Sequence, residues 1–355
     1  VAMTFQLTTA KFSVLFNHRV FKIFIGNIYK IAIITSIILG LLIVFNANYL
    51  QDIFKTSSKK MFTVFGLAVP FYFIMSVNRG VFQGKNMLQF LSISYQAEMI
   101  SRLLITISLL YFLNIESSLV IAIGILCSLI IGLIPFNFKN FSFKKQGVLN
   151  VSYKKQIRNF IAITAFYELT QIIINNSDIL LVKHYFNSLD AGLYASLALI
   201  GRVVYFIAWM FVMLLLPTVV QLKKEGKQTT HILIKYVFYI SLIAIFIIIV
   251  TYIFPNTIVN ILFGSQFLEI SHLLWKYALA TGIFAVSNIF AYYYLSLDRY
   301  LPVILSGILG SLQIICIMLF HNNIEQVIHV QIIVMIVLLI MQLVFFFIDI
   351  KKSKH

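Results

Sequence analysis

Residues 236–254, YVFYISLIAIFIIIVTYIF, form a run without a charged side chain that is long enough to cross a bilayer. A spanning helix needs about 20 mostly apolar residues, because hydrocarbon offers no partner for backbone N–H and C=O groups. Nine further stretches of this kind flank the run. Hydrophobic residues make up 61% of the 355 residues, charged residues only 11%, and the mean hydropathy is +0.97. This composition predicts an all-α, polytopic membrane protein.

The ten predicted spans are separated by short polar loops. They are Tyr29–Leu50, Met61–Val77, Leu88–Leu113, Leu119–Phe136, Phe160–Val182, Ala191–Val220, Tyr236–Phe254, Leu273–Leu295, Leu301–Phe320 and Ile328–Ile350.

Alternate loops differ in their content of Lys and Arg. One set holds most of the 27 cations, including Lys11, Arg79 and six within residues 137–158, whereas the other set holds only four. By the positive-inside rule, both termini lie on the cytoplasmic side. The formal net charge of +16 then indicates contact with anionic membrane lipids rather than with nucleic acid.

The longest basic loop, residues 137–158 (NFKNFSFKKQGVLNVSYKKQIR), separates four spans from six. Residues 75–94 (MSVNRGVFQGKNMLQFLSIS) and 291–307 (AYYYLSLDRYLPVILSG) each suggest a helix, a short cytoplasmic turn with an Arg, and a second helix. If the two segments correspond, the repeat period is six helices. We therefore expect an N-terminal bundle at 1–136, a linker at 137–158 and a six-helix bundle at 159–355, in a 6+6 protein whose first two helices precede this sequence.

Charged side chains inside spans are the candidate functional residues, because burial of a charge in a bilayer costs about 2.5–3.5 kcal/mol. In residues 160–182, a polar stripe of Glu168, Gln171, Asn175 and Asp178 falls within an arc of about 80° at helical spacing. The stripe indicates a lumen-lining helix whose carboxylates bind a proton or cation. The alternative is that Asp178 lies near the outer interface and Glu168 pairs within the bundle.

Arg202 lies inside the next span, with Tyr194, Tyr205 and Trp209 on the same face. A planar guanidinium framed by aromatic rings suits a phosphate-containing headgroup. The alternative is a salt bridge from Arg202 to Glu168 or Asp178, and the two can alternate between conformations.

Glu98 and Arg102 are four residues apart, which favours a self-neutralising pair on one helix. The candidate substrate contacts are Arg202, Tyr205, Trp209 and Arg102, and the candidate ion-coupling residues are Glu168, Asp178, Asn175 and Glu98.

No sequence motif points to catalysis or to a bound cofactor. Gly-rich phosphate loops, HExxH and CxxC pairs are lacking, and Cys127 and Cys316 lie in apolar stretches. The loops leave no room for a soluble catalytic domain, so we expect a transporter rather than an enzyme, without metal or cofactor.

Two segments resemble a known family. NRGVFQGKNMLQFLSIS (78–94) is similar to its Arg-Gly-x-x-Gln-Gly turn, and DILLVKHYFNSLDAGLYASLALIGRVV (178–204) is similar to the segment joining its helices seven and eight. The chain thus resembles the Wzx-type polysaccharide or O-antigen flippases of the multidrug/oligosaccharidyl-lipid/polysaccharide exporter superfamily.

The resemblance implies a V-shaped pair of six-helix bundles around a cationic cavity in the bacterial inner membrane. Such proteins flip an undecaprenyl-pyrophosphate-linked oligosaccharide for O-antigen and lipopolysaccharide biosynthesis, with polymerase and other assembly proteins as partners. The resemblance also implies that Arg202 is a cavity arginine that contacts the pyrophosphate. A drug/cation antiporter of the same superfamily remains the alternative, and a membrane-embedded polymerase or ligase is a weaker one.

Overall fold

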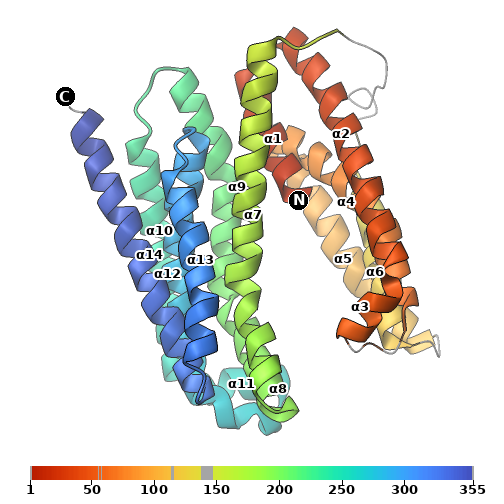
Figure 1. The fold of residues 1–355 in the computed structure, drawn as a ribbon, viewed down its shortest axis with the longest axis vertical. Helices are drawn as coiled ribbons and strands as arrows, with labels where there is room; N and C mark the ends of the chain where they lie inside the picture. The colour runs from red at the N-terminus through yellow and green to blue at the C-terminus, as the bar shows by residue number, and fades with distance from the viewer. Residues whose placement is uncertain (1, 55, 57, 113–115, 137–146, 354–355) are drawn as a thin grey trace. The chain divides into compact units, whose positions relative to one another are not determined.

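The computed structural model describes residues 2–54, 56, 58–112, 116–136 and 147–353, and each regular element in these ranges is a helix (Figure 1). The chain divides into two compact units, Val1–Ile161 and Ala162–His355. The boundary falls inside one long helix, α7 (Val151–Tyr185). Ten residues of the predicted linker, 137–146, lie outside the described residues.

The first unit is built around α4. Its helices are α1 (Ala2–Leu15), α2 (His18–Phe45), α3 (Ala47–Phe54), α4 (Lys60–Gly84), α5 (Leu88–Phe112), α6 (Ser117–Ile131) and the first turns of α7. Helix α4 packs against α1, α2 and α6, and α5 packs against α6. Gly40 of α2 and Gly66 of α4 allow close approach, since a Cβ at Gly40 would lie 2.5 Å from the Gly66 carbonyl oxygen.

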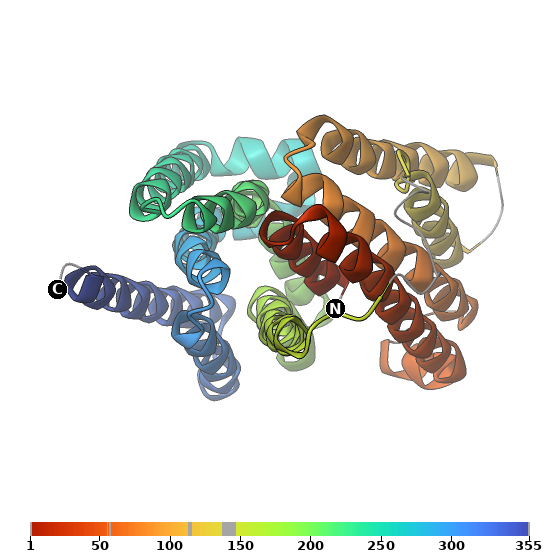
Figure 2. The same ribbon diagram turned by 90° about the horizontal axis from the view of Figure 1, so that it is seen from above.

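The second unit is built around α12, which is buried along nearly its whole length. Its elements after α7 are α8 (Ser188–Gly201), α9 (Val203–Lys224), α10 (Thr230–Ile253), α11 (Pro255–Phe263), the 3-10 helix η1 (Ser265–Leu273), α12 (Leu274–Ser296), α13 (Leu301–Leu319) and α14 (Ile324–Ser353). Helix α12 packs against α8, α9, α10, α13 and α14, whose long axes run side by side when Figures 1 and 2 are compared.

In the described residues, each of the ten predicted spans contains a helix, although α6 ends at Ile131, five residues before the predicted end at Phe136. Eight helices of the described residues are long and apolar enough to cross a membrane, with α8 and α9 counted as one and η1 and α12 counted as one. Helix α5 is not among them, because Glu98, Arg102 and several uncharged polar residues lower its hydropathy. Helix α6 is apolar but has only 15 residues, which at 1.5 Å per residue is about 22 Å.

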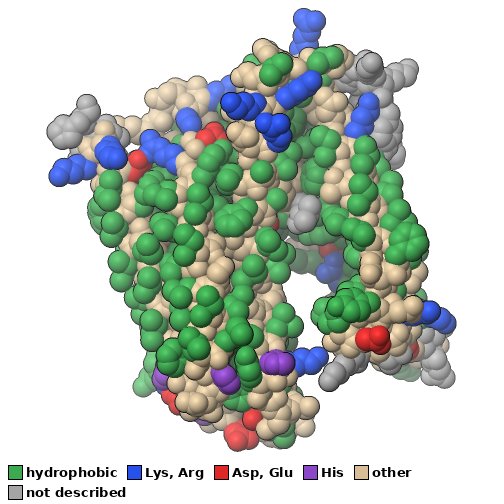
Figure 3. Space-filling view, in the orientation of Figure 1, with side chains coloured by type: hydrophobic (Ala, Val, Ile, Leu, Met, Phe, Trp, Pro, Cys, Tyr) green, Lys and Arg blue, Asp and Glu red, His purple; other side chains and the backbone are tan. Residues whose placement is uncertain are grey.

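The outer surface matches this assignment. Large apolar side chains such as Phe45 (78% exposed) and Ile261 (76% exposed) point outward, as lipid contact requires. In the second unit, Lys and Arg side chains gather at the end where α14 terminates, and His and acidic side chains lie at the opposite end (Figure 3).

Several residues predicted to lie in loops are in fact helical. Helix α1 was not predicted, and its Lys11 is 1% exposed, with its ammonium 4.2 Å from the centre of the Phe160 ring. Arg79 is 3% exposed inside α4, which continues seven residues beyond the predicted end at Val77. Residues 151–158 of the predicted linker are the first turns of α7. Hydropathy marks only the membrane-embedded part of a helix, so polar turns that continue it are missed.

The two segments that predicted a repeat do share a turn. Asn86 after α4 and Asp298 after α12 are left-handed, with φ of 56° and 62°. Met87 N–H bonds Phe82 O at 2.8 Å, and Arg299 N–H bonds Tyr294 O at 2.9 Å, which is the Schellman pattern in both turns.

This geometry corrects the predicted correspondence of the two arginines. Met87 is the structural counterpart of Arg299, whereas Arg79 lies two turns earlier inside α4.

Candidate functional site

Three of the four residues in the polar stripe of α7 are buried in the second unit: Glu168, Gln171 and Asp178. Asp178 is 1% exposed and Glu168 is 8% exposed, so both carboxylates are buried. The two carboxylates have different surroundings, and each is described in turn.

Asp178 is the shared acceptor of a network that joins four helices. Arg202 Nη2 lies 3.1 Å from Asp178 Oδ1, and the hydroxyls of Tyr194 and Tyr277 donate to Oδ2 at 2.9 and 2.7 Å. Gln331 of α14 donates to Tyr194 at 2.6 Å. The alternative of an Arg202–Asp178 salt bridge is therefore present in this conformation.

Arg202 is positioned by a break in the predicted span Ala191–Val220. It lies between α8 and α9 with φ −77° and ψ −3°. The preceding Gly201 lets Tyr277 approach, since a Cβ there would lie 2.3 Å from the ring carbon Cδ1. Thr281 donates to Gly201 O at 2.6 Å, and Tyr277 accepts from Arg202 Nε at 3.2 Å. Close packing of α12 on the break therefore orients the guanidinium of Arg202 towards Asp178.

Glu168 is held by neutral groups. The hydroxyl of Tyr292 on α12 donates to Glu168 Oε1 at 2.7 Å. The adjacent Tyr167 packs edge-on against Tyr292, with ring centres 4.9 Å apart, and hydrogen bonds Asn288. Glu168 is therefore held by a tyrosine hydroxyl, whereas Asp178 pairs with an arginine.

A cavity of about 210 Å³ lies beside Glu168 and Arg202. It is lined by residues of α7 and α9 together with Arg202, namely Glu168, Gln171, Ile172, Asn175, Asn176, Arg202, Tyr205 and Phe206. The structure thus brings together four of the predicted site residues: Glu168, Asn175, Arg202 and Tyr205. Asp178 contacts the guanidinium but does not line this cavity, and Trp209 is half-buried one turn further along α9.

The remaining two candidates, Glu98 and Arg102, form the expected ion pair in the first unit. The structure adds Arg79, whose Nη1 lies 2.8 Å from Glu98 Oε2. Arg79 also donates to Ser94 Oγ and Ser94 O, both at 2.8 Å, and its guanidinium stacks 3.9 Å from the centre of the Tyr95 ring. The cluster joins α4 and α5, and Arg102 extends it to Ser128 of α6 at 3.2 Å.

Sequence reasoning missed Arg79 because it follows the predicted span. The signal was available, since Val77, Val81 and Phe82 continue an apolar helical face past Arg79. In the described part of the chain, no three His, Cys, Asp or Glu side chains come together as metal ligands.

Comparison with known proteins identifies the family. A family model described as "Polysaccharide biosynthesis protein" matches residues 17–272. The chain belongs to this family. A search of the curated proteins found no match to this polysaccharide biosynthesis family member.

Solved structures show the fold of the family member. A MATE transporter in the straight conformation superposes with a TM-score of 0.79 and 9% identity, covering 99% of this chain and 85% of that chain. A point mutant of the Vibrio cholerae MATE transporter VcmN gives 0.73 and 14%, covering 99% and 85%. The eukaryotic MATE transporter AtDTX14 gives 0.72 and 15%, covering 97% and 84%. The predicted all-α, polytopic fold is thereby confirmed, and it is the fold of these solved transporters.

Proposed function

We propose that this protein flips an undecaprenyl-pyrophosphate-linked oligosaccharide across the bacterial inner membrane by alternating access. The observation that carries the proposal is Arg202, which lines a cavity while Asp178 holds one edge of its guanidinium. The match to a polysaccharide biosynthesis family supports a lipid-linked sugar as cargo. The proposed orientation, with both termini cytoplasmic, follows from the distribution of Lys and Arg.

The N–H donors of Arg202 can exchange one hydrogen-bond acceptor for another. A guanidinium carries five N–H groups, and those of Arg202 meet Asp178, Tyr277 and, at 3.4 Å, Asn176. A pyrophosphate oxygen can accept from Arg202 Nη2 in place of Asp178 Oδ1, and a pyrophosphate carries more negative charge. We infer that the substrate replaces Asp178 on Arg202 when it enters, so that Asp178 keeps the site neutral in the empty state.

Glu168 supplies the proposed coupling to a proton or sodium gradient. Its carboxylate lines the same cavity, and Tyr292 stabilises it without neutralising it. Charging and discharging Glu168 beside Arg202 would change the field that an anionic substrate meets.

Proteoliposomes loaded with the lipid-linked oligosaccharide test the proposal. Arg202→Gln should lower the initial flipping rate about tenfold or more, because a buried charged contact to phosphate is lost. The double variant Arg202→Gln/Asp178→Asn removes both charges and separates substrate binding from the cost of an unpaired Asp178. Arg158→Gln, exposed on α7, is the matched control and should leave the rate unchanged.

The second candidate function is a drug/cation antiporter. It is favoured by Glu168, a cavity carboxylate with a tyrosine partner, and by the MATE transporters that share the fold. Efflux of a lipophilic cationic dye discriminates the two. If Glu168→Gln abolishes dye efflux while Arg202→Gln leaves both dye efflux and oligosaccharide flipping intact, the flippase assignment is wrong.

A further inference from the structure

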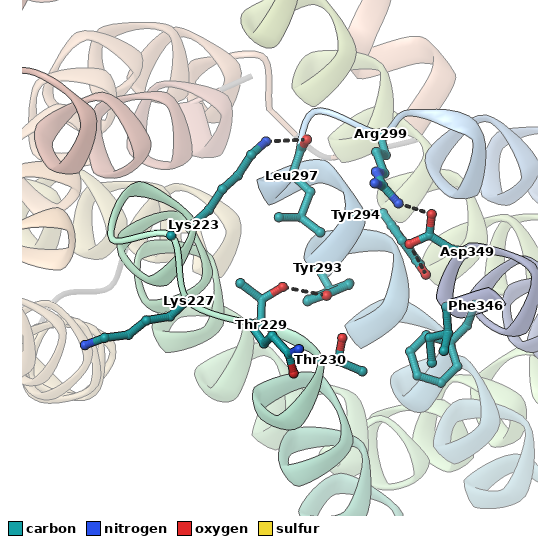
Figure 4. Close-up of a pocket in the computed structure, with 13 residues that line it drawn as sticks. Lys223, Lys227, Thr229, Thr230, Tyr293, Tyr294, Leu297, Arg299, Phe346 and Asp349 are labelled. Carbon is teal, nitrogen blue, oxygen red and sulfur yellow. Dashed lines mark hydrogen bonds and ion pairs between the residues drawn. The ribbon is translucent and has the colours of Figure 1, made fainter. Parts of the chain in front are cut away.

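A second cavity lies at the end of the second unit where α9, α12 and α14 terminate and α10 begins (Figure 4). Its volume is about 530 Å³, which is within the usual range for small-molecule sites of about 300–1,000 Å³. It shares no lining residue with the cavity beside Arg202. The proposed transport path therefore does not involve this second cavity.

Two cationic side chains stand at its rim on either side of Leu297 (Figure 4). Lys223, in the last turn of α9, donates one of its three protons to Leu297 O at 3.0 Å. Arg299, just after α12, contacts Asp349 of α14 through Nη1. Lys223 and Arg299 therefore each have further N–H groups that can donate to another acceptor.

Hydroxyl groups line the floor between these cations and α10. Thr229 and Tyr293 hydrogen bond at 2.7 Å, and Thr230 lies beside them. The left-handed Gly226, with φ 71°, closes a Schellman turn after α9 and brings Thr229 back towards α12. Two cations with adjacent hydroxyls form the donor set that a phosphate group needs.

Lys227 also lines the cavity but is engaged elsewhere. Its ammonium lies 2.7 Å from Glu225, and Figure 4 shows it directed away from Arg299. The hydrogen bonds from Lys227 and Gln221 hold the pKa of Glu225 below its usual range. Lys227 and Glu225 thus neutralise each other, and Lys223 and Arg299 are the cations that face the cavity.

The flanks of the cavity are those of a membrane interface. Tyr293, Tyr294 and Phe346 line it, and rings of this kind gather at the headgroup level of bilayers. Helix α12 packs between α10 and α14, whose outer faces carry Phe238 (60% exposed) and Phe347 (65% exposed). A lipid whose headgroup enters the cavity can therefore keep its acyl chains along apolar helix surfaces.

We propose that this cavity binds the phosphate of an anionic phospholipid headgroup from the leaflet at the basic end of the protein. Lys223 and Arg299 contact the phosphate oxygens, and the one O–H proton that the Thr229–Tyr293 hydrogen bond leaves over donates to the phosphate as well. Asp349 competes with the lipid for Arg299 and limits the affinity.

Binding of phosphatidylglycerol and phosphatidylcholine to the purified chain, counted by native mass spectrometry, tests the proposal. The variant Lys223→Gln/Arg299→Gln should weaken phosphatidylglycerol binding about tenfold or more, since each cation near a charged lipid contributes about 1 kcal/mol. The matched control Lys351→Gln/Lys352→Gln removes two exposed cations from the same end outside the cavity and should leave this binding event intact. An equal loss in both variants would show a general surface charge and overturn the site.

The sign of a third variant separates binding from folding. Asp349→Asn should raise phosphatidylglycerol affinity, because it removes the competing carboxylate, whereas a purely structural Arg299–Asp349 pair predicts no gain. Tyr293→Phe, which keeps every charge, should weaken binding and keeps the test valid if the double variant fails to fold. Glycerol phosphate, which lacks acyl chains, should not displace the lipid. If it binds as tightly, the site takes soluble phosphates and the lipid assignment fails.

Discussion

The two units solve the burial of charge in different ways. In the first, Glu98 is clamped between Arg79 and Arg102, and Arg79 is further tied to Ser94 and the Tyr95 ring. In the second, Asp178 has one arginine and two tyrosine hydroxyls, while Glu168 has a tyrosine and an adjoining cavity. The sequence patterns made Glu98, Glu168 and Asp178 candidates for the same role, ion coupling. The structure shows that their surroundings differ.

The partners of a buried charge indicate whether it holds helices together or can contact a ligand. Arg79 of α4 donates to Ser94 of α5, and Arg102 of α5 donates to Ser128 of α6, so the cluster fastens these three helices together. Arg202 and Glu168 line a space that a ligand can enter. We therefore propose that the Glu98 cluster serves stability and that the substrate and ion contacts lie in the second unit.

Replacing Glu98 by Gln has the largest expected effect. It leaves Arg79 buried without its anion, and breaking a buried ion pair costs about 3–5 kcal/mol. Unfolding of the detergent-solubilised protein, followed by thermal or denaturant melts, measures the loss. Glu225→Gln, at an exposed turn, should leave the melting curve unchanged. A similar curve for both variants would show that the cluster does not fasten the first unit.

Replacing Gly201 by Ala tests how the second network is held. The added methyl would meet the Tyr277 ring, and crowding of this kind costs about 1–3 kcal/mol. Because Tyr277 bonds both Asp178 and Arg202, flipping should fall as well. Gly192→Ala on α8, with nothing within 4 Å of its Cβ, is the matched control for the same measurements. If Gly201→Ala behaves like Gly192→Ala, close packing does not position Arg202.

Replacing Glu168 by Gln has the smallest expected effect on stability. The amide oxygen can accept from Tyr292 as the carboxylate does, so the cost should stay below about 1 kcal/mol. Transport should nevertheless lose its dependence on proton or sodium gradients, which is measured with and without each gradient. A destabilisation as large as that of Glu98→Gln would mean that Glu168 is a structural charge, and the comparison between the units would break down.

Part of the site was predictable from the sequence, and part was not. Glu168, Asn175 and Arg202 were found because apolar spans make each polar residue conspicuous, and helical spacing placed them on common faces. Helix α1 was missed because AMTFQLTTAKFSVL carries four threonine or glutamine residues and a lysine, which gives no hydropathy signal. Tyr292 and Tyr277 were also missed, because a tyrosine's partner is set by neighbouring helices.

The sequence alone determined that the chain is a bundle of apolar helices, and it located the apolar part of most of them. Bilayer thickness and the need to satisfy the backbone act on each segment by itself, and therefore leave their mark in composition. Only the tertiary structure decided which charges pair. Arg79 meets Glu98 across 19 positions of the chain and Tyr277 meets Asp178 across 99, and such partners are chosen by helix packing at glycines and turns, which no local pattern records.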